Sequence, residues 1–153
     1  MSRYIVSPHA QGTDEWRQDR LGRVTGSACA AVFATVKSGE AATRANMRMA
    51  LVLERITGVP TPQGFQETED IAWGKEQEPH SRMAYELERE LEIEEMGFAY
   101  LPDAMTGCSL DGKIIERGRT GFWESKSPKS KNHYACLRAK APPPEYMPQL
   151  IHN

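Results

Sequence analysis

Residues 107–126, GCSLDGKIIERGRTGFWESK, decide the fold of this chain. The two halves of this stretch are rich in strand-forming residues and lie on either side of Arg117-Gly118, a pair typical of a tight turn. The pattern predicts a β-hairpin with strands over residues 106–115 and 120–127. Gly121 offers a second turning point, so a longer loop is the alternative.

The length of the turn determines which side chains meet across the hairpin. In a two-residue turn Glu116 pairs with Arg119, and the same register brings Asp111 opposite Glu124. Because side chains alternate along a strand, Asp111, Glu124 and Lys126 then share one face. A slip of one residue would break this arrangement.

Two carboxylates and a lysine on one face form a set that a metal-dependent phosphodiester nuclease needs. An E-x-K triplet alone is weak evidence, because it arises by chance about once in two chains of this size. Glu124 and Lys126 could also be a solvated ion pair, and Asp111 before a glycine could be a turn residue. Trp123 argues against a solvated face, because burying charged side chains is costly without a function.

Composition excludes several classes of protein. The 153 residues suit one domain spanning 1–153, and the net charge of −2 leaves any DNA contact to a local basic patch. Three cysteines without C-x-x-C spacing argue for reduced thiols and against a cysteine-held zinc or iron–sulfur site. No apolar run approaches the roughly 20 residues of a membrane span, and residues 1–9 lack the features of a signal peptide, so we expect a cytoplasmic protein without membrane contact.

The rest of the chain reads as helices, then a small sheet, then helices again. We expect helices over residues 13–20, 27–35, 41–57, 76–90, 132–139 and 145–152, and an edge strand over 94–101. Thr13 should cap the first helix and Gly58 should end the third. Pro79 must lie near the first turn of its helix or kink it. The order predicts an α+β fold with an α/β/α core.

Two further stretches carry candidate site residues. In residues 73–80, WGKEQEPH, Glu78 could add a carboxylate to the metal site, although Glu76 competes for that role and His80 reads as a surface residue. In residues 16–27, WRQDRLGRVTGS, a helix that begins near Thr25, Gly26 and Ser27 could bind a phosphate. Arg20 or Arg23 would supply the cationic partner.

A local basic patch follows the hairpin. Residues 126–140, KSPKSKNHYACLRAK, contain no acidic residue, and they provide Lys129 and Lys131 as candidate DNA contacts. The literal Pro102-Asp103 pair imitates a nuclease signature but is expected to be a turn.

Taken in order, these motifs resemble the lambda-type exonucleases, also described as YqaJ-like viral recombinases, within the restriction-endonuclease-like nucleases. The resemblance rests on W-x-x-x-R-L-G-x-V-T-G-S at 16–27, W-G-K-x-x-E at 73–78, C-S-x-D-G at 108–112, E-x-K at 124–126 and Y-M-x-Q at 146–149. It implies a restriction-endonuclease-like fold, with a small central mixed sheet flanked by helices.

The resemblance also implies a role for each matching residue. Asp111, Glu124 and the backbone carbonyl of Ser125 would bind Mg²⁺, or Mn²⁺ as a substitute. Lys126 would activate or orient the attacking water, and Glu78 would support the metal site from its helix.

The remaining motifs would contact the DNA. Arg20, Ser27 and Thr25 would bind the 5′ phosphate of a DNA end, Gln149 would line the active site, and Tyr146 would contact DNA. The implied activity is 5′-to-3′ degradation of one strand of duplex DNA in phage or prophage recombination, which leaves 3′ single-stranded tails. The implied partners are double-stranded DNA ends, a single-strand annealing protein and further copies of the chain in a trimeric ring.

The chain departs from the family pattern at three points. Leu110 stands where proline usually precedes the aspartate, and His152 stands where a tyrosine often follows the glutamine. The sequence also stops at Asn153, where relatives continue with a further strand and helices, so we expect a sheet truncated at the C-terminus. Two alternatives therefore stay open: an endonuclease on the same core, and a catalytically impaired module that only binds DNA or a partner protein.

Overall fold

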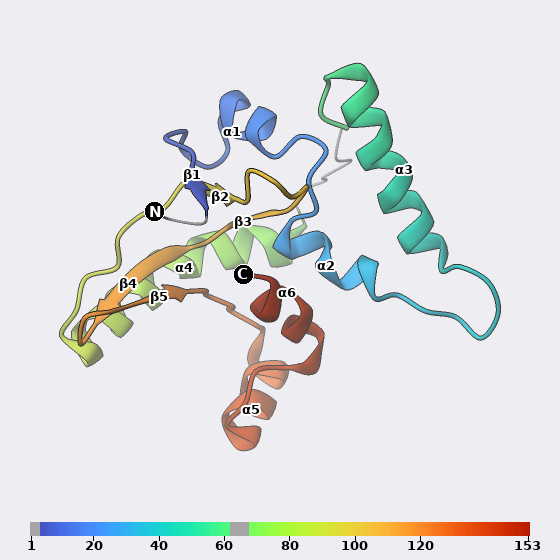
Figure 1. Cartoon of the computed structure of the whole chain (residues 1–153). Coiled ribbons are helices and arrows are strands. Elements are labelled where there is room, and N and C mark those ends of the chain that lie inside the picture. The colour runs from blue at the N-terminus through green and yellow to red at the C-terminus, as the bar shows by residue number, and fades with distance from the viewer. Residues whose placement is uncertain (1–3, 62–67) are drawn as a thin grey trace. The chain divides into compact units, whose positions relative to one another are not determined.

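The computed structural model describes residues 4–61 and 68–153, and it divides the chain into two compact units. The first unit consists of Met1–Pro62, Met96–Leu110 and Glu145–Asn153, and the second consists of Gln63–Glu95 and Asp111–Pro144. Figure 1 shows the elements of both units along the chain. The expectation of a single domain over 1–153 stays a prediction.

The first unit combines a small sheet with short helices. Its elements are β1 (Ile5–Val6), α1 (Asp14–Asp19), α2 (Gly26–Val32), α3 (Ala42–Thr57), β2 (Phe98–Tyr100), β3 (Gly107–Ser109), the 3₁₀ helix η1 (Pro144–Tyr146) and α6 (Met147–His152). The strands form an antiparallel sheet in the order β1-β2-β3. Phe98 is fully buried at the centre of this sheet, where it pairs with Ser109.

Local chemistry determines where these helices begin and end. The Thr13 side chain accepts a hydrogen bond from the Trp16 amide and caps α1 as predicted. Gly58 ends α3 with φ at 68°, a conformation that costs glycine little. Helix α2 packs closely on α6: a Cβ atom at Gly26 would lie 2.3 Å from the Asn153 side chain, so a larger residue there would require that side chain to shift.

The second unit contains the predicted hairpin. Strands β4 (Gly112–Glu116) and β5 (Arg119–Trp123) pair antiparallel, and Glu116 lies opposite Arg119 as predicted. Positive φ angles of 51° at Arg117 and 75° at Gly118 are those of the two-residue turn that suits a hairpin. Helices α4 (Glu69–Arg89) and α5 (Ser130–Ala139) complete the unit. The predicted register is therefore confirmed, and the wider turn at Gly121 is not formed.

Several expected boundaries were wrong. Residues 106–115 are not one strand, because the chain leaves β3 at Ser109 and β4 begins only at Gly112. The strand expected at a sheet edge is central, since β1 covers the free side of β2. Helix α4 begins at Glu69, where the Thr68 side chain accepts from the Ile71 amide, so Pro79 lies inside the helix. The loop expected over residues 59–68 falls mostly outside the described residues.

The sheets differ in detail from the expected central mixed sheet. Both are antiparallel, and within the described residues the parallel pairing is limited to an isolated bridge between Val24 and Thr106. The predicted turn at Pro102-Asp103 is present. Mixed helices and small sheets nevertheless confirm the predicted α+β class. Within the part of the chain that the structure describes, no helix is both long and apolar enough to cross a membrane.

Candidate functional site

The acidic pair lies at the open end of the β4–β5 hairpin, in the second unit. Gly112 and Trp123 form the last strand pair, so Asp111 and Glu124 follow one step beyond it in the same register. The Asp111 carboxylate accepts a 2.8 Å hydrogen bond from the Ser125 amide, which joins the two chain segments where the ladder ends. The predicted juxtaposition of Asp111 with residues 124–126 is therefore formed.

Glu124 and Lys126 are in direct contact. The Lys126 Nζ lies 2.5 Å from the Glu124 Oε1, as expected for side chains two residues apart on one face. The Glu124 side chain is only 3% exposed, whereas that of Lys126 is 34% exposed. A carboxylate this deeply buried needs a cationic partner, so the solvated surface pair considered as the alternative does not describe Glu124.

Glu78 lies within electrostatic range of the same pair. Burial raises the pKa of Glu78, and the charges of Asp111 and Glu124 raise it further, while Arg82 and Lys126 oppose the shift. Its competitors Glu76 and His80 are exposed, which favours Glu78 among the three candidates on α4. This region therefore holds an excess of negative charge.

The donor set fits a hard divalent cation, although the carboxylates are not gathered into a complete cage. Among residues 4–61 and 68–153, no group of three His, Cys, Asp or Glu side chains lies at metal-ligand spacing. Mg²⁺ needs few protein ligands, since it keeps several waters and takes carboxylate oxygens. The mutual repulsion that raises the pKa of Glu78 is also what a bound cation would relieve.

Two residues that the sequence reasoning missed hold α4 against the start of β4. Arg82 donates to the Asp111 carbonyl at 2.8 Å and to the Ile93 carbonyl at 3.3 Å. Glu86 accepts a 2.8 Å hydrogen bond from the Ile93 amide. The spacing of four residues between Glu78 and Arg82, and again between Arg82 and Glu86, puts all three on one side of α4. That periodicity was the signal in the sequence that could have identified them.

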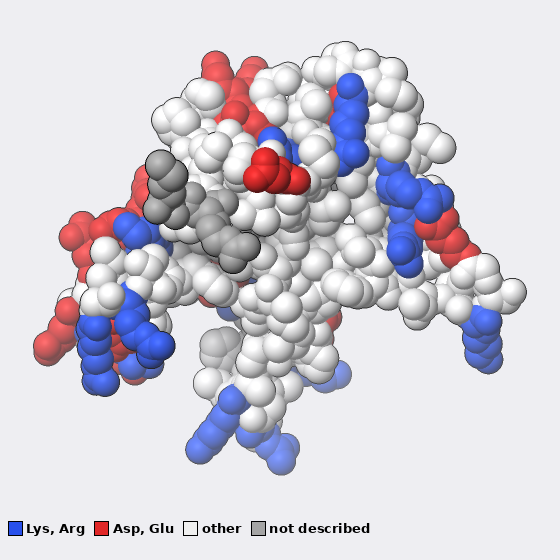
Figure 2. All heavy atoms as spheres, in the orientation of Figure 1, with Lys and Arg blue, Asp and Glu red and all other residues white. Residues whose placement is uncertain are grey.

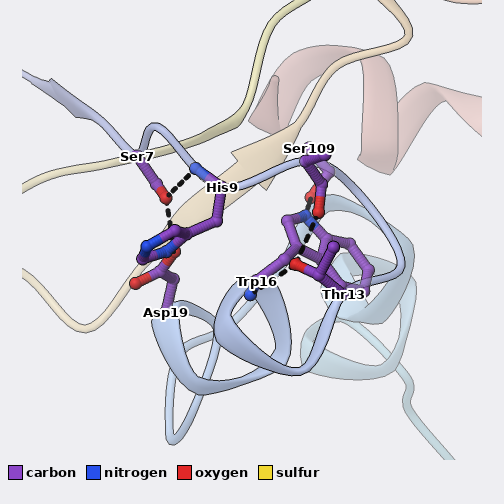
Figure 3. A network of polar contacts seen from close by, with 7 residues as sticks. Ser7, His9, Thr13, Trp16, Asp19 and Ser109 are labelled. Atoms are coloured by element: carbon purple, nitrogen blue, oxygen red, sulfur yellow. Dashed lines mark hydrogen bonds and ion pairs between the residues drawn. The ribbon is translucent and has the colours of Figure 1, made fainter.

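A second polar site lies in the first unit, around Ser109. Its hydroxyl oxygen accepts from Arg20 at 2.8 Å and from the Trp16 indole at 3.2 Å, and Figure 3 shows the Trp16 ring pointing toward it. The Arg20 guanidinium lies 4.2 Å from the Trp16 ring centroid and 5.8 Å from that of Phe98. Sequence reasoning had identified Arg20 but had missed Ser109, which β3 brings to it.

Arg20 is an unusual arginine. Burial lowers its pKa, and the charge of Glu54 offsets this only in part. No carboxylate of the described residues lies within ion-pair distance of its guanidinium, which instead rests on two aromatic rings and Ser109. The alternative, Arg23, donates through one guanidinium nitrogen to the Ala104 and Leu101 carbonyls and lies over Tyr100, so part of its hydrogen-bonding capacity is used within the fold.

The other predicted phosphate ligands lie at the start of α2. The hydroxyls of Thr25 and Ser27 are 3.4 Å apart, and Thr25 is buried. Thr25 precedes the helix, but its side chain makes no capping hydrogen bond. Within the described residues, no hydrogen bond joins Arg20 to either hydroxyl.

Figure 3 also shows a network that fastens the N-terminal segment to α1. Ser7 donates to the Asp19 carboxylate, and the His9 ring lies 2.8 Å from the same oxygen. Burial raises the pKa of Asp19, but these two hydrogen bonds and the charges of His9 and Arg23 together lower it below its ordinary value. Because Ser7 is buried, the network holds the N-terminal segment against α1.

Sequence similarity identifies the family of this chain. The sequence model of the YqaJ-like viral recombinase domain matches residues 15–153. The chain belongs to this family. No curated protein matches the chain.

The solved structures similar to this YqaJ-like domain include two of an alkaline exonuclease. The crystal structure of the alkaline exonuclease LHK-Exo from Laribacter hongkongensis superposes with a TM-score of 0.72 at 33% identity, covering 90% of this chain and 64% of that one. Its complex with dAMP gives 0.74 at 34% identity, with 90% and 65% covered. The predicted restriction-endonuclease-like fold is confirmed, and the YqaJ-like domain spans about 65% of the length of the exonuclease chains.

The last candidate residues of the YqaJ-like domain lie on or beside α5 and α6. Lys129 precedes α5 and pairs with Asp70 at 2.7 Å, while Lys131 is exposed. In Figure 2 the charged side chains visible over α5 are blue, as expected for a segment without acids. Gln149 packs against the start of α2, and Tyr146 is half-buried at the start of α6. Both belong to the first unit, whereas Asp111 belongs to the second.

Proposed function

We propose that this chain is a Mg²⁺-dependent exonuclease that degrades one strand of double-stranded DNA from 5′ to 3′ and leaves 3′ single-stranded tails in phage or prophage recombination. The observation that carries the proposal is the end of the hairpin. Asp111 and Glu124 follow the last strand pair there, and Lys126 contacts the buried Glu124 carboxylate.

The proposed ligands are the Asp111 and Glu124 carboxylates and the Ser125 carbonyl, with Glu78 in support. Mg²⁺ bound there, or Mn²⁺ in its place, would neutralise the negative charge that builds on the phosphate during hydrolysis. The Ser125 amide holds the Asp111 carboxylate in place before any metal arrives, and the partly exposed Lys126 can orient a water toward the phosphorus.

The direction of degradation rests on Arg20 and Ser109. The Ser109 oxygen already accepts from Arg20 and Trp16, which leaves its one proton free to donate to a phosphate oxygen. Arg20 carries further N–H donors and has no carboxylate partner among the described residues, and a phosphate is the natural occupant of such a site. Ser27 and Thr25 would add hydroxyl donors. A pocket for a terminal phosphate is useful to an end-processing enzyme, so it favours an exonuclease over an endonuclease.

The assembly and partners of the whole protein are part of the same proposal. The chain spans about 65% of the LHK-Exo chain. We therefore propose a trimeric ring and a single-strand annealing partner on the basis of family membership alone. One observation favours the alternative of a catalytically impaired module that binds DNA. Among the described residues, the carboxylates do not form a three-ligand cluster.

The test compares three substrates in the presence of Mg²⁺ or Mn²⁺: linear duplexes with and without a 5′ phosphate, and a closed circle. The proposal expects degradation of the linear forms, faster with the 5′ phosphate, and none of the circle. Cutting of the circle would identify an endonuclease, and DNA binding without cleavage would identify the impaired module. Lys126→Ala should abolish cleavage while DNA binding, measured by fluorescence anisotropy, persists.

A further inference from the structure

One side chain of α4 connects the segments that carry the acidic pair. Arg82 donates to two backbone carbonyls at once, at 2.8 Å to Asp111 and at 3.3 Å to Ile93. Its guanidinium lies 5.7 Å from the centroid of the buried Trp123 ring, next to Glu124 in sequence. A single planar group thus lies against both strands at the open end of the hairpin, where the proposed ligands are.

The surroundings of Arg82 leave the start of β4 little freedom. Ile93 is buried, and Glu86 accepts from its amide. A Cβ atom at Gly112 would lie 2.1 Å from the Ile93 side chain, so β4 begins in close contact with this residue. Asp111, the residue just before β4, is held at two points. Arg82 donates to its backbone carbonyl, and the Ser125 amide donates to its carboxylate.

We propose that Arg82 is a positioning residue for the metal site: its two-pronged contact fixes the Asp111 backbone so that the Asp111 carboxylate stays aligned with Glu124 and with Glu78 on the same helix. This inference rests on the proposed metal-dependent function. Arg82 itself touches no reacting atom, and it acts through the orientation of Asp111. Mutation of groups that orient metal ligands in this way typically weakens metal affinity by about 10–100-fold.

The proposed role requires the geometry of an arginine, so it can be distinguished from an effect of positive charge alone. The planar guanidinium donates along two directions with fixed geometry, whereas a lysine ammonium at the same position is a point charge on a flexible chain. Positive charge near the carboxylates would survive Arg82→Lys, but the simultaneous contact with Asp111 and Ile93 would not. Arg82→Met removes both the charge and the hydrogen bonds while it keeps an apolar side chain of similar length.

The experiment measures metal affinity directly, by calorimetric titration of the full chain with Mn²⁺ in the absence of DNA. We expect Arg82→Met and Arg82→Lys each to weaken binding by about tenfold relative to the wild type. Two control variants on the same helix should stay close to the wild type. Arg89→Met removes a cation that lies over Tyr85, and Glu86→Gln alters the other contact to Ile93 without touching Asp111.

Each outcome has a definite meaning. Wild-type Mn²⁺ affinity in Arg82→Lys would overturn the proposal, because the positive charge alone would then maintain the metal site. An equal loss of affinity in Glu86→Gln would also overturn it, because any weakening of the contacts to Ile93 would then have the same effect. The circular dichroism spectrum of each variant reports folding, and if Arg82→Met does not fold, Arg82→Lys decides. Failure of the wild type to bind Mn²⁺ would instead refute the proposed function itself.

Discussion

Ser109→Ala tests the proposed phosphate site, because it removes one oxygen that joins β3 to α1 in the first unit. Ser109 accepts from Arg20 at 2.8 Å and from Trp16 at 3.2 Å, so its loss leaves one charged and one neutral donor without this partner. Hydrogen bonds to charged groups contribute about 1.5–3 kcal/mol and neutral ones about 0.5–1.5 kcal/mol. Both donors belong to half-buried residues that water can partly reach, so the lower end of the sum, about 2 kcal/mol, is the expected loss.

The variant should therefore melt about 4–8 °C below the wild type in a thermal scan followed by circular dichroism. It should also lose about tenfold in the preference for 5′-phosphorylated over hydroxyl ends, measured as a ratio of kcat/KM, because the hydroxyl that donates to the phosphate is gone. Ser38→Ala, at an exposed serine, is the matched control and should change neither quantity. A lowered melting temperature with an unchanged end preference would show that Ser109 only supports the fold, and would refute its role in phosphate binding.

Three further changes test other parts of the chain. Asp111→Asn should abolish Mn²⁺ binding in a calorimetric titration at nearly unchanged stability, because the amide oxygen still accepts from Ser125; retained affinity would exclude Asp111 as a ligand. Gly112→Ala should cost about 1–3 kcal/mol in urea unfolding, because its Cβ would lie 2.1 Å from Ile93, and an unchanged midpoint would contradict the close packing described. The lowered pKa of Asp19 means that the unfolded chain binds protons first as the pH falls. The contribution of Asp19 to stability is thus present above its ordinary pKa of 3.8 and is lost as the pH falls below it. Asp19→Asn should therefore flatten the fall in stability at acid pH, and an unaltered fall would contradict this role.

Much of the local structure could be predicted because its causes lie close together in the sequence. The Arg117-Gly118 turn and the two-residue period of the strands fix the hairpin register, and with it the position of Asp111 opposite Glu124. The Thr13 cap and the Gly58 stop likewise depend on groups within four residues. The contact between Glu124 and Lys126 follows from the same alternation.

Other predictions failed for lack of local information. The two-residue strand β1 is too short to show a period, so its cover of β2 was missed, and β2 was expected at a sheet edge. The sequence predicted that helix α4 starts at residue 76, with Pro79 either near its first turn or at a kink. In the structure, the Thr68 cap sets the start of the helix instead.

The sequence by itself determined the acidic pair, its lysine and the register that aligns them, because a turn and an alternating strand act over a few residues. Only the tertiary structure decided how these groups are held. Ser109 lies 89 positions from Arg20 and 93 from Trp16, and Arg82 reaches Asp111 over 29. Arg82 binds a backbone carbonyl, which every residue carries, so no residue type in the sequence marks its partner. Packing of distant segments alone selects that contact, and with it the alignment on which metal binding would depend.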